Sequence, residues 1–162
     1  MSKIVPCLWY GDEAEEAAKF YVSLVPDSRI DNVQRSPADY PHGKAGQVIV
    51  VEFTLAGQRF MALNGGMRME YTHAVSFVID CADQQEVDRV WDKILSHGGK
   101  AEQCGWIRDR YGVAWQIVPS ALPKLLGGPD KAGARRAMQA MLEMVKLDVA
   151  TLERAYAGES AA

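Results

Sequence analysis

One stretch of sequence decides the fold of this chain: Cys104-Gly105-Trp106-Ile107-Arg108-Asp109-Arg110-Tyr111-Gly112-Val113-Ala114-Trp115-Gln116-Ile117-Val118-Pro119. It predicts a short strand, a tight turn at Asp109–Gly112 and a second strand, because turn-forming residues separate two runs with strand-like alternation. On the second strand Ala114, Gln116 and Val118 share one face, and Val113, Trp115 and Ile117 share the other. The stretch therefore predicts a strand–turn–strand unit with two distinct faces.

The same scheme of elements occurs in both halves of the chain. An apolar strand at Lys3–Tyr10 is followed by Asp12–Glu15, and a strand at His73–Asp80 is followed by Asp83–Glu86. An acidic N-cap with Glu three residues later is the capping-box spacing that begins a helix. Each cap precedes an apolar stripe at helical spacing, formed by Ala14, Ala17, Ala18, Tyr21, Leu24 and Val25 and by Val87, Val90, Trp91, Ile94 and Leu95. Gly98 is suited to the left-handed end of the second helix.

Strands rather than further helices follow each predicted helix. Their residue ranges are 29–35, 47–56 and 58–64 in the first half and 100–104, 106–108 and 113–119 in the second. The closing strands correspond, since Gly57 precedes Phe60 and Gly112 precedes Trp115 by three residues. We therefore expect two β-α-β-β-β modules, at residues 3–64 and 73–119.

The remaining segments are a polar loop and a C-terminal tail. Pro37, Pro41 and Gly43 in the loop at residues 36–46 discourage regular structure. The tail is predicted to be helical from about residue 121 to 157, with an apolar face over Met138–Val145. Leu147 and Asp148 have the arrangement of a hydrophobic staple and an N-cap for the last helix. We expect one domain at residues 1–126 and a helical extension at 127–162.

Bulk properties exclude several classes of function. A net charge of −3 over 162 residues gives no basic surface for nucleic acid. No apolar run approaches the roughly 20 residues that a membrane-spanning helix needs. The N-terminal residues lack the apolar core of a signal peptide, so we expect a cytoplasmic protein. Cys7, Cys81 and Cys104 have no Cys-x-x-Cys spacing, which argues against structural zinc and a disulfide framework.

Several motifs resemble the PhnB-like branch of the vicinal-oxygen-chelate (glyoxalase/bleomycin resistance/dioxygenase) superfamily, which is often labelled 3-demethylubiquinone-9 3-methyltransferase-like. The resemblance covers about residues 3–126. It implies an α+β fold of paired βαβββ modules, with curved, largely antiparallel sheets around a cavity, commonly in dimers. The motifs are Pro6-Cys7-Leu8-Trp9, Glu15-Glu16-Ala17 with Phe20-Tyr21, Gly57 to Gly66, Gln85-Glu86-Val87-Asp88 with Trp91, Cys104-Gly105-Trp106 and Trp115 to Pro119.

Metal-dependent members of the superfamily carry ligands on the first and last strands of each module. Alignment of the two halves places these positions at Val5, Met61, Ala74 and Gln116. Divalent transition metals prefer imidazole, carboxylate or thiolate ligands, so we expect no metal and no cofactor. His73 lies one residue from an expected position, and a one-residue shift on a strand turns a side chain to the other face.

The methyltransferase label has no support in the motifs. A typical S-adenosylmethionine site uses a glycine-rich turn after the first strand of a parallel sheet. Gly65-Gly66 instead follows a hairpin strand and begins no clear helix. No nucleophile with an adjacent base has an activating motif either.

A concave sheet with a few polar groups among aromatic residues is the expected small-molecule site. Glu52 lies within an apolar run, so a cavity-facing carboxylate there would have a raised pKa and could act as a base, whereas an outward orientation beside Val50 is the alternative. The ligand-binding candidates are Trp9, Glu52, Phe53, Met61, Asn64, His73, Trp106 and Gln116.

Three hypotheses follow for function. The first is a metal-independent protein that binds a small organic molecule, with or without a catalytic step. The second is a metal-dependent lyase or dioxygenase with a shifted ligand set such as His73, Glu52 and Gln116. The third is an antibiotic-sequestering protein of the bleomycin-resistance kind. We also expect a homodimer whose interface includes the Met138–Val145 face, because an amphipathic helix must bury its apolar side.

Overall fold

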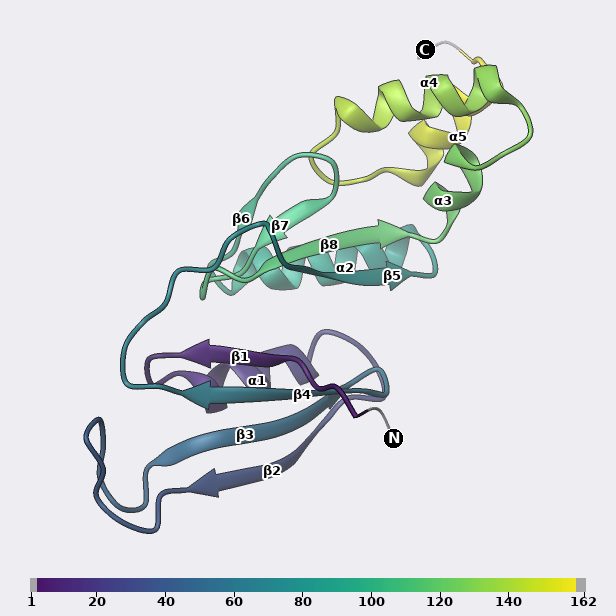
Figure 1. The fold of residues 1–162 in the computed structure, drawn as a ribbon. Helices are drawn as coiled ribbons and strands as arrows, with labels where there is room; N and C mark the ends of the chain where they lie inside the picture. The colour runs from purple at the N-terminus through teal and green to yellow at the C-terminus, as the bar shows by residue number, and fades with distance from the viewer. Residues whose placement is uncertain (1–2, 160–162) are drawn as a thin grey trace. The chain divides into compact units, whose positions relative to one another are not determined.

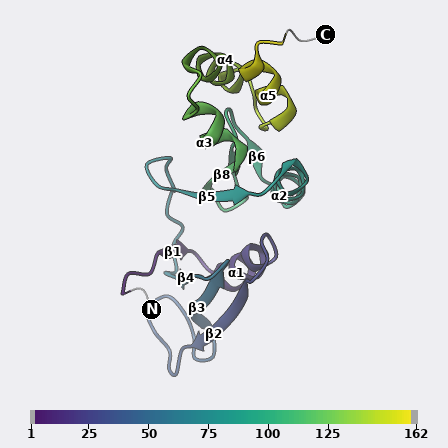
Figure 2. The same cartoon turned by 90° about the vertical axis from the view of Figure 1, so that its right-hand side faces the viewer.

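The computed structural model describes residues 3–159 and divides the chain into two compact units, Met1–Glu70 and Tyr71–Ala162. Each unit contains a four-stranded sheet with one long helix against one face, as Figures 1 and 2 show for α1 and α2. The predicted α+β fold with two βαβββ modules is confirmed. The C-terminal helices belong to the same compact unit as the second module.

The first sheet has the strand order β1-β4-β3-β2. Strands β2, β3 and β4 pair antiparallel in sequence, and β1 joins the edge of β4 in parallel, with Cys7 opposite Met61. The elements are β1 (Cys7–Tyr10), α1 (Ala14–Val22), β2 (Arg29–Arg35), β3 (Val48–Leu55) and β4 (Gln58–Asn64).

The second sheet repeats this topology in the order β5-β8-β7-β6. Strand β5 lies parallel to β8, with Val78 opposite Gln116, and the other two pairs are antiparallel. The elements are β5 (Ser76–Cys81), α2 (Gln84–Ser96), β6 (Lys100–Ala101), β7 (Trp106–Arg108) and β8 (Ala114–Pro119). Both sheets are therefore mixed. In each, the strand before the helix is an edge strand that pairs in parallel with the last strand of the module.

The apolar stripe of each helix covers one face of its sheet. In the first unit Ala17 and Tyr21 of α1 are fully buried, and Phe53 stacks on Phe60 with ring centroids 5.4 Å apart. In the second unit Val90 and Ile94 are fully buried. Each large apolar side chain removed from water in this way contributes about 1.5–3 kcal/mol. One face of each sheet is thereby occupied by core packing, which leaves the opposite face for other contacts.

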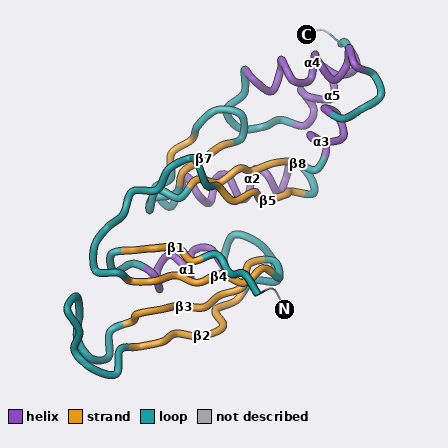
Figure 3. Tube along the Cα trace, viewed as in Figure 1, coloured by secondary structure: helices purple, strands orange, loops and turns teal. Residues whose placement is uncertain are grey.

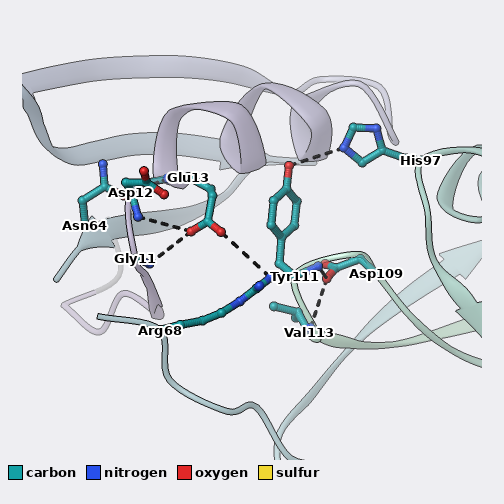
Figure 4. A network of polar contacts seen from close by, with 10 residues as sticks. Gly11, Asp12, Glu13, Asn64, Arg68, His97, Asp109, Tyr111 and Val113 are labelled. Carbon is teal, nitrogen blue, oxygen red and sulfur yellow. Dashed lines mark hydrogen bonds and ion pairs between the residues drawn. The ribbon is translucent and has the colours of Figure 1, made fainter. Parts of the chain in front are cut away.

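The expected capping box at the start of α1 is wrong. The helix begins at Ala14, its N-cap is Glu13, and no side chain of the N-cap residue accepts a helix N–H. Instead Asn64 Oδ1 from the end of β4 accepts the Ala14 N–H at 2.9 Å. The Glu13 carboxylate accepts the Gly11 and Asp12 N–H groups and lies 3.9 Å from Arg68, as Figure 4 shows. A tertiary contact has replaced the local cap.

The capping box at the start of α2 is confirmed. Asp83 has an extended backbone and its carboxylate accepts the Glu86 N–H at 2.9 Å. Glu86 reaches back and accepts the Ala82 N–H at 2.9 Å. Gly98, just beyond the end of α2, has a φ of 90°, the left-handed conformation expected of it.

The turn between β7 and β8 is organised by one buried carboxylate. Asp109 accepts hydrogen bonds from the N–H groups of Tyr111 and Val113 at 2.9 and 3.0 Å (Figure 4). Its second oxygen accepts the indole N–H of Trp115 at 2.9 Å. Gly112 has a φ of 93°, which a side chain would make costly. The stretch that predicted a strand–turn–strand unit forms one.

The tail consists of α3 (Ala121–Leu126), α4 (Lys131–Leu142) and α5 (Val149–Ala157), coloured purple near the C-terminus in Figure 3. Leu122, Leu147 and Leu152 form a buried cluster, and Asp148 accepts the Thr151 N–H at 2.7 Å, so the predicted staple and cap are confirmed. No helix among residues 3–159 is long and apolar enough to cross a membrane.

Candidate functional site

The second sheet has one covered face and one open face. Ile107, Trp115 and Ile117 are buried on the α2 side. Alternation along the strands places Trp106, Arg108 and Gln116 on the opposite side, where each is only partly buried. Ser76 and Val78 of β5 share this side, since they pair with Ala114 and Gln116. The open face is therefore the part of this unit that is available to a ligand.

Glu102 connects the polar side chains of the open face. Its Oε2 lies 2.6 Å from His73 Nε2, and its Oε1 accepts a hydrogen bond from Arg108 Nε at 2.9 Å. The His73 ring lies against Trp106, with ring centroids 5.7 Å apart. We call His73, Glu102, Trp106, Arg108 and Gln116 the open-face cluster. It brings together an indole, a guanidinium and an amide from the strands and an imidazole and a carboxylate from the segments beside them.

The surroundings of Glu102 favour its ionised form. Partial burial raises the pKa of this carboxyl, but the hydrogen bonds and charges of His73 and Arg108 outweigh burial, so the pKa lies below its usual value. Glu102 is thus a carboxylate at neutral pH. A carboxylate hydrogen-bonded to one imidazole nitrogen orients the ring, as in many sites where His binds or transfers a proton.

Gln116 is held at the centre of the face. Its Nε2 donates to Ser76 Oγ at 2.9 Å, and its Cα pairs with that of Trp106 across the β7–β8 ladder. An amide fixed beside an indole offers hydrogen bonding next to a flat apolar surface. This combination suits a small molecule that is both planar and polar.

The open face of the first sheet carries three of the predicted candidates. Glu52 pairs with Arg59 at 3.7 Å and accepts a hydrogen bond from Asn32 at 3.3 Å, so it has polar partners on its own sheet. Met61 lies opposite Cys7. The indole N–H of Trp9 donates to Met67 O at 2.7 Å, and its ring covers Gly65 so closely that a Cβ there would collide with it.

Two other candidates have structural positions. Phe53 is fully buried beneath α1, on the face away from Glu52. Asn64 holds the start of α1 and also donates to Val48 O at 3.0 Å, which ties β4 to β3. Among the predicted residues, the second unit thus brings together His73, Trp106 and Gln116, while the first unit carries the others.

The positions that bear metals in related folds do not offer suitable ligands here. Met61 has Cys7 as its strand neighbour, and Gln116 has Val78. Val5 and Ala74 precede β1 and β5 and carry only hydrocarbon side chains. Within residues 3–159 no three or more His, Cys, Asp and Glu residues gather in a way that could hold a metal ion. The donor set therefore does not fit a transition metal of the usual kind.

Glu102 and Arg108 are site residues that sequence reasoning did not identify. Arg108 could have been found, because it is two residues from Trp106 on a predicted strand and must share its face. Glu102 could not, because the sequence predicts a strand over residues 100–104, whereas β6 ends at Ala101 and Glu102 lies just beyond it. Strand β5 also begins at Ser76, later than expected, so His73 lies on the segment that leads into it.

A family model described as 3-demethylubiquinone-9 3-methyltransferase matches residues 2–118, which is most of the chain. The match includes both modules and the open-face cluster. No curated protein gives a match.

Solved structures with the same fold include the PhnB protein from Bacillus cereus, with 34% identity and a TM-score of 0.65 over 74% of this chain and 100% of that chain. PA1353 from Pseudomonas aeruginosa has 17% identity and a TM-score of 0.55 over 74% and 98% of the two chains. The fosfomycin resistance protein FosX from Listeria monocytogenes has 13% identity and a TM-score of 0.52 over 76% and 97%. The last two likenesses concern the fold alone.

Proposed function

Since the chain belongs to the 3-demethylubiquinone-9 3-methyltransferase (PhnB-like) family of the vicinal-oxygen-chelate superfamily, we propose that it binds a small organic molecule without a metal. The binding surface is the open face of the second sheet. The observation that carries this proposal is the open-face cluster, in which Glu102 joins His73 and Arg108 beside Trp106.

The chemistry of the open-face cluster supports a small, planar and polar ligand. Trp106 offers a flat apolar surface, and Gln116 offers hydrogen-bonding groups next to it. Arg108 and Glu102 lie within hydrogen-bonding distance of each other, at 2.9 Å, so their opposite charges are balanced. A ligand with a strong net charge gains little from such a balanced pair, whereas a primary amide can accept a hydrogen bond from Arg108 and donate one to Glu102.

The mixed sheets support binding rather than methyl transfer. In each sheet only one strand pair is parallel, and neither β1 nor β5 is followed by a glycine-rich phosphate-type turn. The usual S-adenosylmethionine site needs such a turn at the start of a helix. The family description therefore does not by itself extend methyl transfer to this chain.

The proposal is tested by NMR titration of the whole protein with benzamide, a planar amide. We expect saturable shifts of the Trp106 indole N–H and the Gln116 side-chain amide, with no added metal. Glu102→Gln removes the charge that orients His73 and Arg108, so it should weaken binding about tenfold. Glu52→Gln is the matched control, because it makes the same change on the open face of the other sheet, and it should leave the affinity unchanged.

Two results would refute the proposal. One is the absence of saturable shifts at Trp106 and Gln116 up to high benzamide concentration. The other is a stoichiometric transition metal in protein purified without chelator, measured by plasma mass spectrometry. The second result would favour the alternative of a metal-dependent lyase or dioxygenase that uses His73, Glu52 and Gln116.

The alternatives have less support from the contacts of their residues. His73 and Gln116 are engaged with Glu102 and Ser76, and Glu52 with Asn32 and Arg59, so metal binding would have to break these contacts. An antibiotic-sequestering protein would need a dry aromatic groove between subunits, and its signature would be binding of large aromatic cations in preference to benzamide.

We propose in addition that the protein forms a homodimer through the tail. Met138 and Leu142 of α4 are both 50% exposed, and Val145 is 47% exposed. The predicted helical face over Met138–Val145 is wrong in its extent, because α4 ends at Leu142 and Val145 lies in the segment that follows. Clustered exposed apolar side chains of this kind are covered most economically by a second copy of the same surface.

A further inference from the structure

A cavity lies in the first unit, and none of its lining residues belongs to the open-face cluster. Its volume is about 730 Å³, which is within the range of small-molecule sites. Its lining residues come from the ends of β1 and β4, the start of α1 and the loop between β2 and β3. Figure 3 shows the course of these segments in the backbone. Its polar lining includes Asp12, Glu15, Arg35, Tyr40, His42 and Gln47.

The loop wall of this cavity is held in place by its own hydrogen bonds. Tyr40 and Gly43 exchange backbone hydrogen bonds at 3.0 and 3.1 Å. Asp39 accepts the Ala45 N–H at 3.0 Å and pairs with Lys44 at 2.8 Å. These hydrogen bonds lie within the loop and give it a defined shape at the cavity wall.

Two glycines let the wall approach its neighbours. A Cβ at Gly43 would collide with the Tyr40 ring, and a Cβ at Gly66 would collide with His42. Gly66 also has a φ of 79°, which disfavours any other residue. The close packing of Tyr40 and His42 against glycine fixes both rings at the cavity wall.

The cavity lining carries charges of both signs. Asp12, just before α1, and Glu15, in its first turn, contribute carboxylates, and Glu15 is already paired with Lys19 at 2.7 Å. Arg35 contributes a guanidinium from the end of β2. Arg35 Nη1 donates to Gly46 O at 3.1 Å, while its Nη2 lies 3.8 Å from Glu15 Oε2. That second distance is too long for a hydrogen bond, so the guanidinium retains donors for a ligand carboxylate.

We propose that this cavity binds a zwitterionic small molecule, with its carboxylate at Arg35 and its ammonium group at Asp12. A simple anion would be repelled by the Asp12 carboxylate, and a simple cation by the Arg35 guanidinium. A ligand that carries both charges satisfies both parts of the lining. Among the lining residues only Val48 and the Tyr40 ring are apolar, which disfavours a lipophilic ligand.

The test is an NMR titration of the full chain with 6-aminohexanoate, compared with hexanoate and hexylamine, which each lack one charge. We expect 6-aminohexanoate to shift the amide signals of Gly11, Gly46 and Gly66 saturably, and each control compound to bind at least about tenfold more weakly. These three glycines line the cavity, so their signals report this site.

Arg35→Gln should weaken 6-aminohexanoate binding about tenfold or more. Arg29→Gln is the matched control, because Arg29 lies on the same strand and pairs with Asp31 at 2.8 Å outside the cavity lining. Asp12→Asn provides a second variant if Arg35→Gln loses its dispersed spectrum. It should weaken 6-aminohexanoate binding and leave hexanoate binding no weaker.

Three results would overturn the proposal: no saturable shift at the three glycines, equal binding of the three compounds, or an equal effect of Arg35→Gln and Arg29→Gln. Binding of 6-aminohexanoate that shifts only the Trp106 indole would overturn it as well. Because benzamide binding is measured at Trp106 in the other unit, either proposal can fail while the other holds.

Discussion

The carboxylate of Asp109 accepts three hydrogen bonds from the turn and the strand that follows it. It is 4% exposed and accepts from two backbone N–H groups and one indole. Burying a charge is costly unless it is fully hydrogen-bonded, and here the donors supply that compensation. The turn at Asp109–Gly112, whose sequence predicts the fold, therefore also holds a buried, fully hydrogen-bonded charge in the second unit.

Asp109→Ala should destabilise the protein by about 3 kcal/mol, because it removes the acceptor of three buried hydrogen bonds. Urea unfolding followed by circular dichroism measures this loss. Asp80→Ala, an exposed aspartate on β5, is the control and should change stability by less than about 0.5 kcal/mol. Similar losses for the two variants would contradict this account of the turn.

Single residues show what a sequence can and cannot predict about the site. Trp106 and Gln116 could be placed together, because strand alternation and the hairpin turn determine their face. Glu102 could not, since its partners depend on where β6 ends. Phe53 lies one residue from Glu52 on the same strand and so belongs to the opposite face, which is the core. Candidates chosen by residue type alone miss this distinction.

At the scale of elements, the N-termini of α1 and α2 are stabilised in different ways. A local side chain caps α2, whereas a side chain from a distant strand caps α1. The Asp83 cap could be predicted because the donor, the acceptor and the extended backbone all lie within four residues. The start of α1 has the same sequence pattern, but there the Ala14 N–H donates a hydrogen bond to the side chain of Asn64, fifty residues away in the sequence. Local spacing cannot predict a partner that only the folded sheet brings near.

The tail is attached to the second module through a few specific contacts. The Gln84 side chain donates to Leu147 O at 3.1 Å and accepts the Val149 N–H at 2.8 Å. Lys146 pairs with Asp88 at 2.7 Å, and the N–H groups of Cys104 and Gly105 donate to Met144 O and Val145 O, both at 2.8 Å. Residues 144–149 therefore join the tail to the second module through both backbone and side-chain contacts.

Gln84→Ala should detach the segment before α5, because it removes the acceptor of the Val149 N–H and the donor to Leu147 O. We expect a destabilisation of about 1–3 kcal/mol. Hydrogen exchange at the Val149 amide should accelerate, whereas the Ile117 amide should exchange as before in the native state. Gln85→Ala changes an exposed neighbour in the same helix turn and should leave both rates unchanged.

At the scale of the whole molecule, the chain consists of two modules with the same topology, and the second module is followed by a helical tail. Both copies keep the same strand order, the same parallel edge and the same helix position. This repeat could be predicted because caps, apolar stripes and closing glycines agree with one another. The size of the exposed apolar patch on the tail could not be predicted, because it depends on which side chains pack against the cluster of Leu122, Leu147 and Leu152.

The proposed dimer makes a prediction about two neighbouring residues of α4. Leu142 is exposed, whereas Met141 packs against the Leu122, Leu147 and Leu152 cluster. Leu142→Lys should therefore yield a folded monomer, and Met141→Lys should loosen the tail itself. Light scattering should give about twice 17.9 kDa for the unmodified chain and about 17.9 kDa for Leu142→Lys. A mass near 17.9 kDa for the unmodified chain at micromolar concentration would refute the dimer.

The small sequence separation between Asp109 and its hydrogen-bond donors bears on the order in which the second unit folds. Its three partners lie two, four and six residues along the chain. Loops of this length close on a timescale of about 10–100 ns, well before distant segments meet. The contact between Gln116 and Ser76 spans forty residues, so the parallel edge strand must wait for a slower search. The β7–β8 hairpin is thus suited to act as the nucleus on which β5 and α2 assemble.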